Sequence, residues 1–395
     1  MKKLFCETNK YKILATIRYL GDGLFYPFFA LYLRSREMTE AHIGFILSIS
    51  PLLAILMNPI YSKICKKPKD TKNALMIITV IEGLCIASIA FLKDFYVISA
   101  VTLLMAIFGA CHYGLMDALT ALYADQAKIN YSSIRLFGSS AYIIATTLGG
   151  ILCNTSFKLS FILSSVLFVL SGLIYHILTP MEVEKDETIE DDLKDNSFIV
   201  VLKNKELWLF GLIYMLLLGT TKITDNFFSV YLESRGLGAK EYGLIYSYFV
   251  LFEVISLIVF DKLLKKNRHT YLWFLVSCVC LLTRTLVNYL YLSLIVVVLI
   301  TCLRGFGYAI ILHITFAKAI DIVGEKASTK AIMFLTLLYS IFVFAFNNIG
   351  GLVIETYSYK TFYMMGMIIV VFTMLLIALK LIIDKKISSH IRKNF

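Results

Sequence analysis

The sequence predicts an all-α membrane protein whose twelve transmembrane helices form two pseudo-symmetric six-helix halves. Of its 395 residues, 59% are hydrophobic and only 16% are charged. A soluble domain keeps about 25% of its residues charged, so this chain has too few charges to cover a surface that faces only water. Its long apolar runs favour helices, because lipid cannot satisfy open backbone groups and a membrane barrel needs short segments of alternating polarity.

Each predicted span is an apolar run of about the 20 residues that a bilayer requires. Six runs precede a polar segment and six follow it. The predicted spans are residues 11–33, 43–64, 73–92, 96–123, 134–153, 157–179, 207–231, 241–264, 271–291, 293–317, 330–354 and 361–383.

The polar segment between the sixth and seventh spans is rich in Asp and Glu and has no apolar periodicity, so we expect it to be a solvated linker. The predicted domains are an N-terminal half at 1–179, an acidic cytoplasmic linker at 180–200 and a C-terminal half at 201–395.

The basic residues predict the orientation. With the N-terminus inside, 26 of the 38 Lys and Arg lie in the segments on the inner side and seven in those on the outer side. This bias is typical of cytoplasmic loops, so we expect a multi-pass protein of the cytoplasmic (inner) membrane with both termini in the cytoplasm. The net charge of +11 then reports topology, and no nucleic-acid partner is expected.

The two halves share an internal repeat. FFALYLRSREMTEAHIGFILS at 28–48 aligns without gaps with FFSVYLESRGLGAKEYGLIYS at 227–247. Chance similarity between apolar segments is the alternative, but the identities include polar pairs. These are Ser35/Ser234, Arg36/Arg235 and Ser48/Ser247. Repeated halves are typical of transporters that bind their solute between the repeats.

Charged residues inside the predicted spans are candidate functional residues, because a charge at the centre of a bilayer costs about 2.5–3.5 kcal/mol. Together with two histidines, the candidates are Arg18, Asp22, Glu82, His112, Asp117, Arg135, Lys222, Asp225, Glu253, Arg284, Arg304 and His313.

Three of these charges lie in the first helices of the two halves, one in the N-terminal half and two in the C-terminal half. Lys222 and Asp225 are three residues apart and can meet on one helix face, and Asp22 lies in the corresponding first span. We expect a gating or inter-half salt bridge here that opens and closes, with a static bridge as the alternative. Glu82 has no assigned role, and the two histidines are expected to pack between helices.

Three segments resemble the major facilitator superfamily, and most closely its galactoside–proton symporters and phenylpropionate permeases. They are GLFYPFFALYL at 23–33, DALTALYADQAKINYSSIRLFGSSAY at 117–142 and VLFEVISLIVFDKLLKK at 250–266. The resemblance implies the major facilitator fold and a secondary active transporter that moves a small solute by alternating access. It implies no bound cofactor, with a proton gradient as the driving force.

The resemblance implies that Asp117 and Arg135 contact the substrate. A carboxylate and a guanidinium can grip a hydroxylated or acidic solute from two sides, although a structural ion pair between the two helices is the alternative. Tyr142 lies two helical turns beyond Arg135. The family has an aromatic residue there that stacks on the substrate ring, and simple packing is the alternative.

Glu253 is the predicted proton carrier, because it lies among apolar residues near the middle of its span. Arg284 and Arg304 are the cations expected near it, and a permanent Glu253–Arg284 ion pair is the alternative. The galactoside symporters carry a His–Glu pair on the tenth helix, where this sequence has Arg304 and Gly307. Glu253 is therefore expected to carry the proton nearly alone.

The favoured function is a proton symporter for a sugar, a nucleoside or an aromatic acid. The alternatives are an exporter or antiporter of the same fold and a non-transporting membrane sensor. An enzyme is not expected, because no nucleophile–base set or phosphate-binding loop is evident. The eight cysteines lie mostly in apolar runs, so no metal site is expected. The expected partners are a small-molecule substrate and the lipid bilayer, with the protein a monomer.

Overall fold

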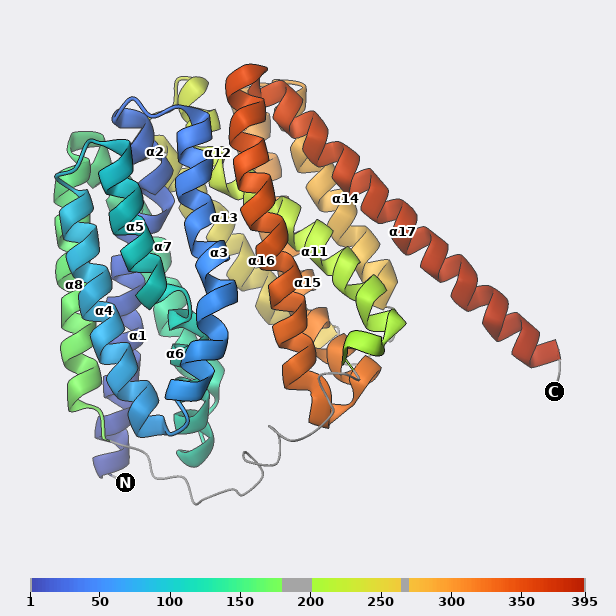
Figure 1. Ribbon diagram of the computed structural model, residues 1–395, viewed down its shortest axis with the longest axis horizontal. Coiled ribbons are helices and arrows are strands. Elements are labelled where there is room, and N and C mark those ends of the chain that lie inside the picture. Colours follow the sequence, from blue (N-terminus) through green and yellow to red (C-terminus); the bar gives the residue numbers. More distant parts are fainter. Residues whose placement is uncertain (1, 180–200, 264–269, 394–395) are drawn as a thin grey trace. The chain divides into compact units, whose positions relative to one another are not determined.

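The computed structural model describes residues 2–179, 201–263 and 270–393, and within these ranges it contains helices and no strand (Figure 1). The first six-helix half follows the predicted spans. Its elements are α1 (Lys2–Phe25), the 3-10 turn η1 (Tyr26–Phe28), α2 (Phe29–Ser35), α3 (Glu40–Ile64), α4 (Pro68–Ile89), α5 (Phe95–Gly109), α6 (His112–Gln126), α7 (Tyr131–Thr155) and α8 (Phe157–Ile177).

The second half repeats this order of helices: its long first helix is again followed by a short helix. The predicted linker at 180–200 falls outside the described residues. The elements that follow it are α11 (Lys205–Asn226), α12 (Phe228–Ser234), α13 (Ala239–Leu263), α14 (Thr270–Tyr289), α15 (Leu294–Val323), α16 (Glu325–Thr356) and α17 (Tyr359–Lys393).

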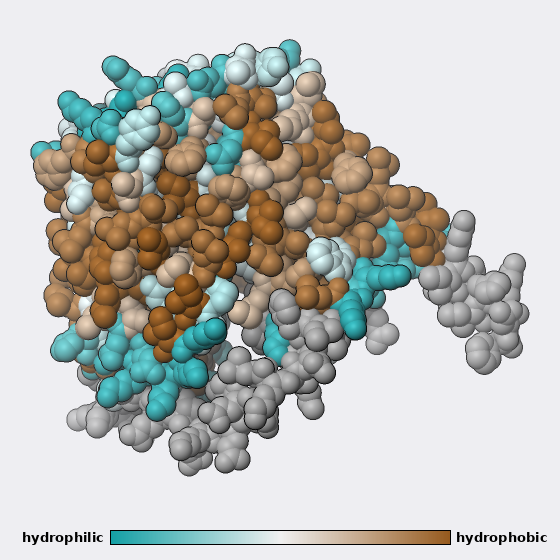
Figure 2. All heavy atoms as spheres, viewed as in Figure 1, coloured by the Kyte–Doolittle hydropathy of each residue, from teal (hydrophilic) through white to brown (hydrophobic). Residues whose placement is uncertain are grey.

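Eleven helical segments of the described chain are long and apolar enough to cross a membrane, with α5 and α6 together forming one of them. The first helix does not qualify by composition, because α1 carries Lys10, Lys12, Arg18 and Asp22. With it, the predicted twelve-helix fold is confirmed. Figure 2 shows hydrophobic side chains along the middle of the helices and hydrophilic side chains near their ends, as lipid requires.

Three predicted spans are interrupted helices. The span at 11–33 bends at η1, where Pro27 lies. The span at 207–231 breaks at Phe227, between α11 and α12. The span at 96–123 breaks after Gly109, and α6 begins at His112. Average hydropathy does not report such breaks, because it is averaged over a whole span and each break involves only a few residues.

The chain forms two compact units. One comprises Met1–Glu187 with Phe227–Tyr248, and the other comprises Thr188–Asn226 with Phe249–Phe395. The segment at 227–248, which contains the repeat, therefore belongs to the first unit. The predicted boundaries of the two halves stay a prediction.

Small residues let the helices of the first unit approach closely, as is common in membrane bundles. A Cβ at Gly23 of α1 would lie 2.6 Å from Ala145 Cβ of α7. The hydroxyls of Ser160 and Ser164 on α8 donate hydrogen bonds to the carbonyls of Leu24 and Gly21 on α1, at 2.8 and 2.7 Å. α1 is therefore held between α7 and α8.

This packing predicts that Gly23→Ala destabilises the protein by about 1–3 kcal/mol, the usual cost of overpacking a tight core. Gly114→Ala is the matched control, because a Cβ there would meet nothing within 4 Å. Thermal unfolding of each variant in detergent measures the difference. Equal unfolding temperatures for the two variants would contradict the close contact between α1 and α7.

Candidate functional site

Asp117 and Arg135 form an ion pair between α6 and α7, and their contact with a substrate stays a prediction. Arg135 on α7 donates through Nη1 to both carboxylate oxygens of Asp117 on α6, at 3.0 and 3.1 Å. Tyr131, one turn before Arg135, donates its hydroxyl proton to Asp117 Oδ1 at 2.6 Å and accepts from Arg135 Nη1 at 2.8 Å. We call these three residues the Asp117 site.

The Asp117 site is accessible. The side chains of Arg135 and Asp117 are 45% and 42% exposed, although both belong to apolar helices. They line a pocket with Tyr11, Tyr19 and Thr120. Aromatic rings thus lie beside a carboxylate and a guanidinium, an arrangement suited to a small solute that has both a ring and polar groups.

Tyr142 lies farther along α7, and its contacts are with other tyrosines rather than with Arg135. Its hydroxyl donates to that of Tyr246 on α13 at 3.3 Å, and its ring meets Tyr19 edge-on, with the centroids 6.3 Å apart. Tyr19 also lines the pocket of the Asp117 site. The structure therefore connects Tyr142 to this pocket through Tyr19.

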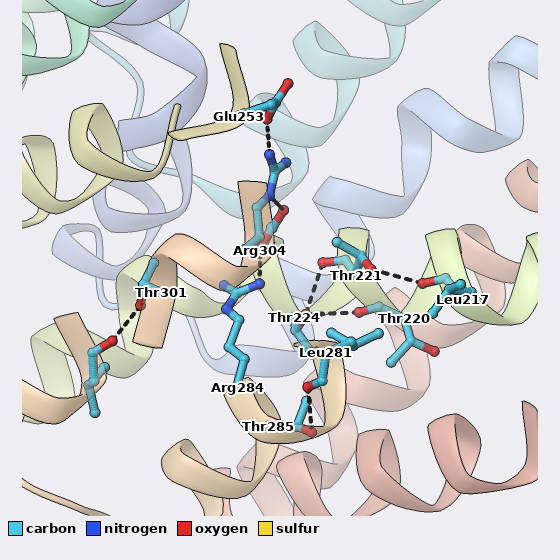
Figure 3. A network of polar contacts seen from close by, with 12 residues as sticks. Leu217, Thr220, Thr221, Thr224, Glu253, Leu281, Arg284, Thr285, Thr301 and Arg304 are labelled. Carbon is cyan, nitrogen blue, oxygen red and sulfur yellow. Dashed lines mark hydrogen bonds and ion pairs between the residues drawn. The ribbon is translucent and has the colours of Figure 1, made fainter. Parts of the chain in front are cut away.

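The second unit contains a row of alternating charges that we call the Arg304 chain: Arg284, Asp225, Arg304 and Glu253. Asp225 on α11 accepts from Arg284 of α14 at 2.6 Å and from Arg304 of α15 at 2.8 Å. Arg304 also pairs with Glu253 of α13. Figure 3 shows Glu253, Arg304 and Arg284 following one another between the helices. With both acids ionised, the row has no net charge.

Exposure changes along the Arg304 chain. The side chain of Arg284 is 2% exposed, those of Asp225 and Arg304 are 9% and 11% exposed, and that of Glu253 is 21% exposed. Glu253 is thus the member that water reaches most easily. The guanidinium of Arg304 also lies over the rings of Phe249 and Tyr308, at 4.8 and 4.5 Å from their centroids.

The alternative of a Glu253–Arg284 ion pair is not observed, because Glu253 pairs with Arg304 and Arg284 pairs with Asp225. Helix packing explains the exchange. A Cβ at Gly305 would lie 2.6 Å from the backbone nitrogen of Glu253. This close approach of α15 to α13 brings the neighbouring Arg304 to Glu253.

The expected contact between Lys222 and Asp225 is also absent. Two guanidinium groups from neighbouring helices occupy the Asp225 carboxylate, while Lys222 is exposed and forms no ion pair with any described residue. Asp22 pairs instead with Arg18 on its own helix, at 3.2 Å. Asp22 belongs to the first unit and the other two residues to the second, so an inter-half bridge stays a prediction.

Sequence reasoning missed Tyr131 and Tyr19 as members of the first site. Tyr131 lies four residues before Arg135, and this spacing places two side chains on one helix face, so the signal was available. Glu82 and Arg18 were named without roles and His112 only as a packing residue, and the structure brings the three together. In the described part of the chain, no three His, Cys, Asp or Glu side chains form a group that could hold a metal ion.

The described chain thus has eleven apolar membrane-length segments, ion pairs buried between its helices and a pocket beside Asp117 and Arg135, which together define a polytopic membrane protein. The chain belongs to the MFS_1 like family, whose model matches residues 10–368. The predicted membership of the major facilitator superfamily is thereby confirmed.

Three curated relatives are transporters by name. The uncharacterized transporter YwbF of Bacillus subtilis (strain 168) is 23% identical over 60% of this chain and 59% of its own length. The probable 3-phenylpropionic acid transporter of Escherichia coli (strain K12) is 24% identical over 63% of this chain and 65% of its own. The sucrose permease of Escherichia coli is 26% identical over 37% and 36%. The chain thus matches less than two thirds of the length of each relative.

Solved structures share the fold. A point mutant of the nucleoside transporter NupG superposes with a TM-score of 0.82 at 17% identity, over 94% of this chain and 99% of that one. A bacterial homolog of the human lysosomal transporter Spinster gives a TM-score of 0.70 at 12% identity, over 95% of each chain.

The Arg304 chain predicts a large stability effect for Asp225→Asn. This change leaves the buried Arg284 without its carboxylate, which should cost about 3–5 kcal/mol of unfolding free energy. Glu206→Gln is the control. It breaks the ion pair with Lys318, in which the Glu206 side chain is 43% exposed, and the loss of such a surface pair should cost about 0–1 kcal/mol of unfolding free energy. Thermal unfolding in detergent separates the two.

A second change provides an internal check on this prediction. The double variant Asp225→Asn/Arg284→Gln should recover part of the loss, because it removes the orphaned charge. If the losses of unfolding free energy from Asp225→Asn and Arg284→Gln simply add in the double variant, the two groups do not interact.

Proposed function

We propose that this transporter is a proton symporter that carries a sugar, a nucleoside or an aromatic acid into the cell by alternating access. It works in the cytoplasmic membrane with both termini in the cytoplasm. The observation that carries the proposal is the Asp117 site, an open carboxylate–guanidinium pair in a pocket lined by tyrosines.

The Asp117 site has hydrogen-bonding capacity left for a solute. Among the described residues, Arg135 uses only Nη1 for hydrogen bonds. Its Nε and Nη2 are therefore available to a carboxylate or to neighbouring hydroxyls, which a planar guanidinium binds with two parallel bonds. Asp117 can accept further hydroxyl protons, and the tyrosine rings offer apolar faces to a sugar or aromatic ring.

The names of the relatives support the same range of solutes. They include a probable carrier of 3-phenylpropionic acid, a sucrose permease and a nucleoside transporter. An aromatic acid would use the guanidinium, whereas a sugar or nucleoside would use both charges. One pocket chemistry therefore serves all three classes.

Proton coupling is assigned to the Arg304 chain. Protonation of Glu253 removes one negative charge from a row that is otherwise balanced, so Arg304 loses one of its two carboxylate partners. A guanidinium released in this way can move or bind another anion. Proton binding at the most exposed member of the row would thus change the arrangement of α13 and α15, as a coupling step requires.

If Asp117 and Arg135 bind the solute, Asp117→Asn and Arg135→Lys should each abolish binding while the fold is kept. The lysine variant keeps the charge but loses the two-pronged geometry. A thermal-shift screen with sucrose, 3-phenylpropionate and uridine first identifies a stabilising solute, and both variants should then lose that shift. Asp125→Asn is the control, because Asp125 is exposed on the same helix. Normal shifts in both variants would leave the pair with a structural role alone.

The coupling step predicts that Glu253→Gln exchanges solute across the membrane but cannot accumulate it against a gradient. Proteoliposomes loaded with the solute found above measure the exchange, and an imposed pH gradient tests accumulation. Glu206→Gln, an exposed carboxylate on α11, should behave like the wild type. Full uphill accumulation by Glu253→Gln would refute proton carriage by this residue.

A further inference from the structure

A second group of ionisable side chains lies deep inside the first unit. We call it the Arg18 cluster: Arg18 and Asp22 on α1, Glu82 on α4 and His112 at the start of α6. None of the four residues is more than 1% exposed. The functional roles proposed above do not use this cluster.

One guanidinium connects the two acids of the Arg18 cluster. Arg18 Nη1 donates to Glu82 Oε2 at 2.9 Å, and its Nη2 lies 3.2 Å from Asp22 Oδ1. Glu82 also accepts from the hydroxyl of Tyr26 at 3.4 Å. His112 Nδ1 lies 3.6 Å from Glu82 Oε2. The guanidinium lies over the ring of Phe168, 3.8 Å from its centroid.

The fold makes room for this cluster at the break between α5 and α6. A Cβ at Gly109, the last residue of α5, would overlap the carboxyl group of Glu82. The break that follows starts a new helix at His112, which places the imidazole beside the same carboxyl. Interrupted helices are a common device for building polar sites at membrane depth.

The charges of the Arg18 cluster do not balance. Two ionised carboxylates and one guanidinium leave one negative charge in a site that water does not reach. Uncompensated buried charge is costly, and such a group commonly binds a proton instead. One proton makes the cluster neutral.

Hydrogen bonding gives an independent sign of a missing proton. Neither ring nitrogen of His112 has a hydrogen-bond partner among the described residues. Buried polar atoms in native proteins almost always have one. A protonated Glu82 can donate a hydrogen bond to the imidazole of His112, whose Nδ1 lies 3.6 Å from Glu82 Oε2.

The other ionisable groups around the Arg18 cluster do not alter this balance, because tyrosine and cysteine are uncharged at neutral pH in their ordinary state. They come from η1, α3, α4, α6, α7, α8 and α1 itself. They are Tyr26, Tyr61, Cys85, Tyr113, Tyr142, Tyr175 and Tyr19.

We propose that Asp22 and Glu82 share one proton across Arg18, and that the Arg18 cluster is a proton-binding site of the first unit, separate from Glu253. The inference extends the proposed proton coupling from one unit to both. It can be tested independently of the proposed symport, because its test needs neither a solute nor a transport measurement.

The test is infrared difference spectroscopy of the purified full-length protein in lipid nanodiscs at neutral pH. The wild type should show the carbonyl stretch of a protonated carboxyl group, and the signal should shift in heavy water. Asp22→Asn and Glu82→Gln should each abolish it. In either variant a single carboxylate remains beside Arg18, so the charges balance without the proton. Asp125→Asn, which removes an exposed carboxylate of α6, should leave the signal unchanged.

Each variant preserves the shape of the side chain and removes the excess charge, and size-exclusion chromatography verifies its fold. If one variant does not fold, the other suffices. Absence of the signal from the wild type, or its persistence in a folded Asp22→Asn or Glu82→Gln variant, would overturn the proposal. Loss of coupling at Glu253 has no bearing on this result, so failure of the proposed function can be recognised separately.

Discussion

The need to neutralise guanidinium groups within membrane-spanning helices determines how the helices of this protein pack. Each of the four arginines inside the predicted spans, Arg18, Arg135, Arg284 and Arg304, has a carboxylate partner within 3.2 Å or closer. Desolvation makes an unpaired charge expensive, and a partner offsets the cost only with good geometry. The helices must therefore pack so that acids from one helix reach arginines on another.

Charge balance distinguishes the three groups. The Asp117 site has one charge of each sign and is open, so it can exchange its internal partner for a solute. The Arg304 chain is balanced and reaches water at Glu253, so one proton unbalances it. The Arg18 cluster is closed and carries one acid in excess. Binding a solute, responding to a proton and holding a proton are therefore different consequences of the same pairing rule.

Small residues provide the close approach that this pairing requires. Gly305 lets α15 approach the backbone of Glu253, and Gly109 leaves the space that the Glu82 carboxyl occupies. The proposed transport cycle requires the ion pairs to break and form again in each cycle. Ion pairs between separate helices suit this need, because a small movement of one helix changes both the distance and the charge balance.

Much of the fold could be predicted from the sequence, because lipid imposes a length and a composition on every span. The pairing of Asp117 with Arg135 was also within reach through a family motif that spans two consecutive helices. The breaks at Gly109 and Phe227 were not, since hydropathy averaged over a whole span does not mark the residue at which a helix ends.

Partner choice in the second unit could not be predicted from the sequence. Spacing on one helix favoured Lys222 for Asp225, yet two arginines from neighbouring helices occupy that carboxylate. Sequence spacing describes only one helix at a time. Competition between helices depends on their packing, and the sequence alone does not state which faces meet.

The central claim is that solute entry and proton entry are one event. The direct measurement is the pH of a lightly buffered medium around proteoliposomes when the solute identified by thermal shift is added outside. Symport predicts that the medium becomes alkaline as solute enters down its gradient, and that a protonophore abolishes the change. Solute entry with no change of pH, or with acidification of the medium, would contradict the account.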